Sequence, residues 1–209
     1  MSTADELLTT ELVFSGVLNE LEPGPLAALL SCLVTEGGGN SNKGGGAGGG
    51  AKGGAAGDKG KSGRAVEGEA GGQPGGGQAA SSEASAAIRT IEMREPFERL
   101  RETARKVGTV VEEANLPIDL TAYIDQFAPV LVDVVVEWCK GAKFAEVVEL
   151  SETITYEGSI IRALHRLEEL LRQIIDAAKV VGNEDLEARC HAARKLLIRD
   201  VVFAASLYT

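Results

Sequence analysis

A glycine-rich segment in the first half of the chain limits what the rest of it can fold into. Of the 26 glycines, 20 lie between Gly37 and Gly77, and residues 37–87 contain no Leu, Ile, Phe, Tyr or Trp. Such a segment buries too little apolar surface to offset the entropy lost on ordering. We therefore predict a helical hairpin over 1–36, a disordered linker over 37–87, and a main helical bundle over 88–209 that forms one domain with the hairpin.

The residues outside this linker show the periodicity of helices. Apolar side chains recur at steps of three and four, and no segment alternates clearly enough to be a strand. The predicted fold class is therefore all-α, a helical bundle with one long helix. Helices are expected over 4–20, 26–34, 92–114, 120–140 with an interruption near Pro129, 143–150, 157–181, 183–197 and 200–207.

Some single residues have expected structural roles within this bundle. Gly141 has the position of a helix-ending residue in the left-handed conformation. The aromatic residues Trp138 and Phe144 flank this glycine and are expected in the core where two helices meet. Phe203 and Tyr208 belong to a terminal apolar segment that is expected to dock on the bundle.

The charge balance restricts the partners of the foldable part. Outside the linker, 16 basic residues stand against 27 acidic ones. Proteins that bind nucleic acid on their own gain affinity when basic residues neutralise phosphates, so tight autonomous binding is not expected here. A local basic stripe remains compatible with this charge balance. No apolar run reaches 18 residues and the N-terminus has no signal-peptide pattern, so neither a membrane span nor secretion is predicted.

The residue types that bind metals or form disulfides are few. Cys32, Cys139 and Cys190 lie far apart and are odd in number, which fits a reducing compartment better than a disulfide framework or a zinc site. The only histidines, His165 and His191, have no second ligand at metal-binding spacing. We therefore predict no metal site and no catalytic residue.

One nucleotide-binding pattern occurs, but its context is wrong. Residues 55–62 (AAGDKGKS) satisfy a permissive phosphate-loop pattern, [A/G]-x-x-x-x-G-K-[S/T]. That loop requires a buried strand before it and a helix after it, and a segment of glycine and alanine predicts neither. A linker rich in Gly, Lys and Ser produces the match by composition, so this chain alone is expected not to bind a nucleotide cofactor or hydrolyse ATP.

Four of the ordered blocks along the chain show the sequence's specificity. The run EGSIIRALHRLEELLRQ (157–173) is the most distinctive, and it follows EWCKGAKFAEV (137–147). With ELVFSGVLNELEPGPLAALLSCLV (11–34) and REPFERLRETARKV (94–107), they resemble the C-terminal helical region, called DSHCT, of the DExH-box RNA helicases that feed RNA to the exosome. The two blocks named first are more similar to the nuclear exosome-cofactor branch than to the cytoplasmic superkiller branch.

The resemblance implies a role in RNA unwinding and degradation. In that family the region packs against two motor lobes and closes a ring around single-stranded RNA, and its long helix is the ratchet helix. Carried over by position, Arg162, Arg166, Glu169 and Gln173 would face the RNA. Implied partners are single-stranded RNA, the helicase lobes in cis or in trans, and an exosome-linked complex, with no DNA and no membrane. The implied location is nuclear, with the cytoplasm as the alternative.

The chain departs from the family pattern in three ways. Both ATPase lobes are absent, so ATP and magnesium are expected only in that missing core, and whether this chain acts as an enzyme stays open. It is either a fragment of a full helicase or a free-standing accessory module. The glycine-rich insert replaces a short polar connection, and Thr209 stands where the family usually has leucine.

Three other interpretations of the same residues stay open. The polar stripe on the long helix is, in the simplest one, a solvated face with an Arg166–Glu169 ion pair of some tenths of a kcal/mol. In the second, 143–150 and 157–181 form a helix-turn-helix of a DNA-binding regulator. In the third, the chain is a structural protein-interaction bundle with a flexible tether.

Overall fold

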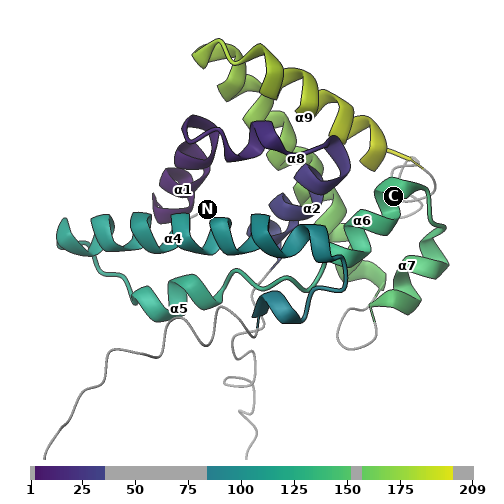
Figure 1. Ribbon diagram of the computed structural model, residues 1–209, viewed down its shortest axis with the longest axis horizontal. Coiled ribbons are helices and arrows are strands. Elements are labelled where there is room, and N and C mark those ends of the chain that lie inside the picture. Colours follow the sequence, from purple (N-terminus) through teal and green to yellow (C-terminus); the bar gives the residue numbers. More distant parts are fainter. Residues whose placement is uncertain (1–2, 36–83, 152–156, 200–209) are drawn as a thin grey trace, which may run out of the picture.

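The computed structural model describes residues 3–35, 84–151 and 157–199. All regular elements in these ranges are helical, which confirms the all-α prediction (Figure 1). The linker residues 37–83, the phosphate-loop-like segment 55–62 and the terminal helix expected over 200–207 lie outside the described residues. The elements are α1 (Thr3–Phe14), η1 (Val17–Glu20), α2 (Pro23–Val34), η2 (Ile91–Met93), α4 (Arg94–Glu113), α5 (Leu120–Asp125), α6 (Val132–Lys140), α7 (Phe144–Leu150), α8 (Glu157–Val181) and α9 (Glu184–Leu197).

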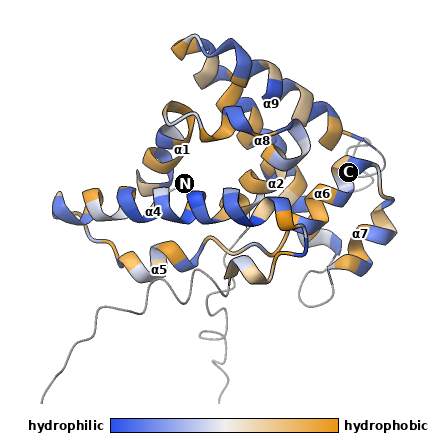
Figure 2. Ribbon diagram, in the orientation of Figure 1, coloured by the Kyte–Doolittle hydropathy of each residue, from blue (hydrophilic) through white to orange (hydrophobic). Residues whose placement is uncertain are grey.

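Helix α2 lies at the centre of the fold. The seven consecutive residues from Leu26 to Cys32 are all buried, and a helix that is apolar on every side must be surrounded by protein. It contacts α4, α6, α8 and α9, while α1 packs against α4 and α8. Hydrophobic residues therefore gather on the inner elements, whereas α4 presents a hydrophilic outer face (Figure 2).

The first helix is shorter than its apolar pattern predicts. Instead of continuing to residue 20, α1 ends at Phe14, because Gly16 has a φ of +75°, a conformation that glycine adopts without the steric cost other residues incur. The 3₁₀ turn η1 follows and buries Leu18. It also places Asn19 opposite Asn183, and the two side-chain amides exchange hydrogen bonds of 3.0 and 3.2 Å.

The described structure resumes at residue 84, so residues 84–87, the predicted end of the linker, belong to the folded body. Residues 84–86 form a helical turn, and the buried Ser85 donates its hydroxyl hydrogen bond to Glu98 at 2.7 Å. Asp133 then accepts hydrogen bonds from the backbone N–H groups of Arg89 and Thr90, both at 2.9 Å. These polar anchors, which apolar periodicity does not reveal, fix the start of the second part of the bundle.

Most other helix boundaries follow the prediction. The segment expected over 120–140 is divided into α5 and α6, with Pro129 in the break. Gly141 ends α6 with a φ of +108°, as its position predicts. The expected helix over 143–150 is α7, and the longest helix, α8, spans 157–181 as predicted.

Trp138 joins the end of α6 to the end of α9. Its side chain is fully buried, its indole N–H donates to the carbonyl oxygen of Leu197 at 3.1 Å, and the Phe144 ring meets it edge-on. The Arg199 guanidinium lies 3.9 Å from the centre of the indole and donates to the carbonyl oxygens of Trp138 and Ala142. The core role predicted for Trp138 is confirmed, and Phe144 is half-buried and packs against the core, while Phe203 and Tyr208 lie outside the described residues.

Replacing Arg199 tests this junction. We expect Arg199→Ala to lower the free energy of unfolding by about 2–3 kcal/mol, because charge-assisted hydrogen bonds and a stacked cation are lost together. As a control, Arg99→Ala removes only ion pairs to Glu20 and Glu95 on the surface, which solvent screens, so its effect on the free energy of unfolding should be clearly smaller. Urea unfolding followed by circular dichroism measures both, and equal losses would contradict the assigned role of Arg199.

Candidate nucleic-acid interface on helix α8

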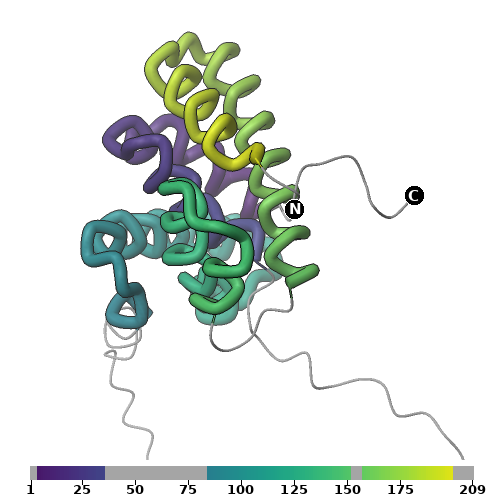
Figure 3. Tube along the Cα trace, turned by 90° about the vertical axis from the view of Figure 1, so that its right-hand side faces the viewer, coloured from purple at the N-terminus to yellow at the C-terminus, as the bar shows by residue number. Residues whose placement is uncertain are grey.

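Helix α8 has one apolar face and one polar face over its 25 residues. Its apolar face packs against α2 and α9, and the helix runs along one edge of the molecule (Figure 3). The buried residues of α8 are Ile160, Ala163, Leu164, Leu167, Glu168, Leu170, Leu171, Ile174, Ile175 and Ala178. The apolar stripe predicted from periodicity is therefore the buried face, except that Ile161 is only half-buried.

The four sequence-predicted site residues lie together on the polar face. Arg162, Arg166, Glu169 and Gln173 are all exposed. With about 100° of rotation per residue they fall within an arc of roughly 60°, and from first to last they extend about 16 Å along the helix axis. We call this set the α8 stripe. The structure thus brings all four onto one accessible surface.

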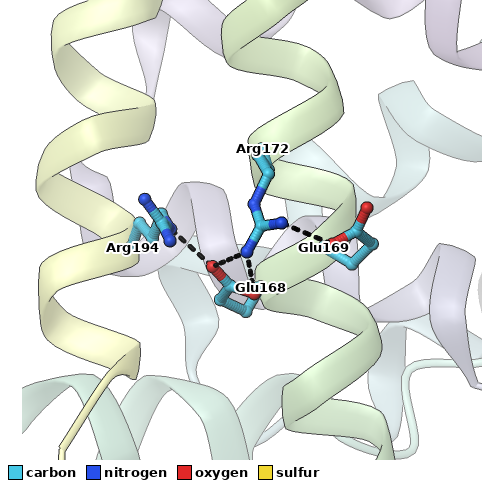
Figure 4. A network of polar contacts seen from close by, with 4 residues as sticks. All are labelled: Glu168, Glu169, Arg172 and Arg194. Atoms are coloured by element: carbon cyan, nitrogen blue, oxygen red, sulfur yellow. Dashed lines mark hydrogen bonds and ion pairs between the residues drawn. The ribbon is translucent and has the colours of Figure 1, made fainter.

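Neighbouring side chains set the local charge of the α8 stripe. The Arg162 guanidinium donates to the Ser159 hydroxyl at 3.0 Å. The Glu169 carboxylate lies 3.4 Å from Arg172, so the ion pair seen for this acid differs from the Arg166–Glu169 pair of the solvated-face interpretation. Arg172 also reaches both carboxylate oxygens of Glu168, at 3.3 and 3.4 Å (Figure 4).

Glu168 is a buried charge that sequence reasoning missed. Only 12% of its side chain is exposed, and its carboxylate accepts a hydrogen bond of 2.5 Å from Arg194 of α9. Figure 4 shows Arg194 and Glu169 on opposite sides of this carboxylate. Because a buried carboxylate requires a partner, an acid within the apolar stripe was a signal for a cation on the adjacent helix.

The described residues offer no cluster that could hold a metal ion, among groups of three or more His, Cys, Asp or Glu. His191 instead lies 3.6 Å from Glu187 on the same helix. The three cysteines are not paired with one another. Within the described ranges, no helix combines the length and the apolar composition needed to cross a bilayer.

Burial controls the titration of the cysteines. It raises the pKa of the Cys32, Cys139 and Cys190 thiols to about 12, against an ordinary value of 9.0. Burial likewise raises the pKa of Tyr123. For each thiol, the folded-state pKa lies above the unfolded-state value. The contribution of the protonated thiols to the free energy of unfolding is therefore complete below pH 9 and is lost as the pH rises toward 12.

We therefore expect the free energy of unfolding to decline in a pH series from about 8 to 11. The half-buried Cys139 offers a suitable variant, because alanine removes one titrating thiol at the edge of the core. Stability of Cys139→Ala should fall less steeply with pH than that of the parent chain. Urea unfolding at each pH gives the two slopes, and identical slopes would contradict the assignment for this thiol.

The described structure is thus an all-helical body with a long, one-sided helix at its edge. A family model, the DSHCT (NUC185) domain, matches residues 1–56 and 74–204. The chain belongs to the DSHCT family. The unmatched residues 57–73 lie within the glycine-rich segment, while residues 37–56 and 74–87 of that segment fall inside the matched ranges.

Several curated relatives of the chain are named as RNA helicases. The chain is 34% identical over 208 residues to the ATP-dependent RNA helicase mtr4 of Schizosaccharomyces pombe and 36% identical over 208 residues to the Exosome RNA helicase MTR4 of Homo sapiens. It is 32% identical over 207 residues to the human Superkiller complex protein 2. These alignments cover 100%, 100% and 99% of this chain but only 15%, 16% and 13% of the relatives. The exosome-helicase branch is thus the nearer of the two.

Glu168 and Glu169 are adjacent on α8, and replacing each in turn distinguishes a structural role from a role at the interface. We expect Glu168→Gln to lower the free energy of unfolding by about 1–3 kcal/mol, since the buried hydrogen bonds lose their charge. Glu169→Gln, at a side chain 53% exposed, should change it by less than about 0.5 kcal/mol. Parallel urea titrations measure both, and the reverse order would contradict the assignment.

Proposed function

We propose that this chain is the accessory domain that guides single-stranded RNA in an exosome-cofactor RNA helicase. One observation carries the proposal: the α8 stripe places two arginines on an accessible surface of a DSHCT domain. The long helix acts as the ratchet helix, and the domain itself performs no chemistry. ATP and magnesium belong to the helicase lobes, which act with this domain in cis or in trans.

The chemistry of the α8 stripe suits transient contact with a polynucleotide. Arg162 and Arg166, one helical turn apart, can pair with phosphates or stack on bases. Glu169 repels phosphate and limits how long the strand is retained. The formal net charge of −10 acts in the same direction, so the isolated domain binds RNA weakly and firm retention of the strand requires the motor lobes.

The likeness to exosome helicases extends the proposal to partners and location. One relative is named an ATP-dependent RNA helicase, and another is named an exosome RNA helicase. By that likeness, we place this domain in an exosome-linked complex in the nucleus, with the cytoplasm as the alternative through the superkiller branch. RNA degradation and processing is the corresponding cellular role.

A helix-turn-helix that reads duplex DNA is less well supported. In that arrangement α7 and α8 would be the two helices, and α8 would enter a major groove. However, α7 packs against α6, and about half of the α8 circumference is buried in the bundle. The acidic charge also opposes autonomous contact with a duplex.

The proposal is tested by the double variant Arg162→Ala with Arg166→Ala, placed in a full-length helicase. We expect unwinding to fall by at least about tenfold, because two charge-assisted contacts are lost. For RNA binding, the slope of log affinity against log salt should shrink by roughly 0.7 for each arginine.

The matched control is Lys106→Ala with Lys195→Ala, which removes two exposed cations from α4 and α9 instead. Circular dichroism and ATP hydrolysis establish that both proteins are folded and have working lobes. Equal unwinding by the arginine variant and the parent would remove the assigned site. A preference of the chain for duplex DNA over single-stranded RNA would favour the helix-turn-helix interpretation.

A further inference from the structure

A groove of about 470 Å³ lies between α1 and α8, next to the α8 stripe. A volume of this size is typical of sites that hold a small organic group. Gln173 belongs both to the groove and to the α8 stripe. The groove is lined by Glu6, Thr9, Thr10, Val13, Phe14, Gln173, Ala177 and Val181.

Phe14, one of the residues that line this groove, is an exposed aromatic side chain. It is 65% exposed at the end of α1, whereas the other aromatic side chains among the described residues are buried or half-buried. An exposed aromatic ring beside side chains that form hydrogen bonds is an arrangement on which proteins stack unpaired bases. Val181 adds a second exposed apolar surface from α8.

The polar lining of the groove favours a base over a phosphate. Among the described residues that line it there is no lysine or arginine, and the one charged residue is the acidic Glu6. The hydroxyls of Thr9 and Thr10 donate to carbonyl oxygens within α1, which leaves their oxygens able to accept a hydrogen bond. The Gln173 amide can donate and accept, as the edge of a nucleobase requires.

The position of the groove fits the course of a strand on the α8 stripe. On a helix, Arg166 and Gln173 are about 10 Å apart along the axis, a length that roughly three stacked nucleotides cover at 3.4 Å each. Around the circumference of α8, Ala177 and Val181 lie on the side of the α8 stripe that is nearer to α1, whereas Arg172 lies on the side nearer to α9. A strand that follows the arginines therefore reaches this groove at the end away from Arg162.

We propose that the groove between α1 and α8 binds one unpaired nucleobase of the RNA strand whose phosphates contact Arg162 and Arg166. Phe14 stacks on the base, and Gln173 hydrogen-bonds to its edge. This inference rests on the proposed function, since it requires RNA on the α8 stripe. It adds a base-holding site at one end of the path, where stacking resists slippage of the strand.

Binding of a single-stranded RNA that carries 2-aminopurine tests the site, because this base loses fluorescence when it stacks. The full 209-residue chain is titrated at low salt with RNAs that carry the probe at successive positions. We expect one position to be quenched on binding, and Phe14→Leu should abolish that quenching and weaken binding roughly fivefold or more. Phe14→Tyr, which keeps the ring, should restore both. Val110→Ser, at a similarly exposed apolar residue of α4, is the matched control and should behave as the parent.

The double variant Arg162→Ala with Arg166→Ala separates the two proposals. If it weakens binding while Phe14→Leu binds and quenches like the parent, the base site is overturned and the RNA path stands. If it binds RNA as tightly as the parent, the proposed function fails. A concentration-dependent dimer that Phe14→Leu abolishes in sedimentation would assign the groove to a second copy of the chain and overturn the base site.

Discussion

The burial of α2 is the constraint on which the rest of the structure depends. Seven consecutive buried residues require neighbours on every side, and α4, α6, α8 and α9 supply them. Because α8 turns its apolar face inward to meet this demand, its polar face is left on the outer edge of the molecule (Figure 3). The candidate RNA surface is thus a consequence of how the core is closed.

Neighbouring charged residues within a single turn of α8 have different roles, one in the bundle and one on the accessible face. Glu168 lies inward and joins α8 to α9 through Arg194, while its neighbour Glu169 lies on the accessible face (Figure 4). Arg172 bridges the two carboxylates. One helix therefore fixes its own position in the bundle and still keeps Arg162 and Arg166 on an accessible face. Under the proposed function, an acidic domain of this kind requires motor lobes to keep RNA in place.

Periodicity in the sequence was sufficient to predict the elements but not the contacts between them. The span of α8, the left-handed Gly141 and the exposure of Arg162 and Arg166 follow from local spacing, which a helix translates directly into faces. The break at Gly16, the anchor at Ser85, and the Glu168–Arg194 pair depend on which segments become neighbours. The groove at Phe14 was missed for the same reason, since its walls are more than 150 residues apart in the chain.

The central claim is that RNA follows the outer face of α8, and cross-linking measures this most directly. Single-stranded RNA with a photoreactive base is irradiated with the full 209-residue chain, and the attached peptides are identified by mass spectrometry. The account predicts that cross-links concentrate in peptides from 157–181 and are competed away by unmodified RNA. Cross-links confined to peptides of α4 or α6, with none in α8, would contradict it.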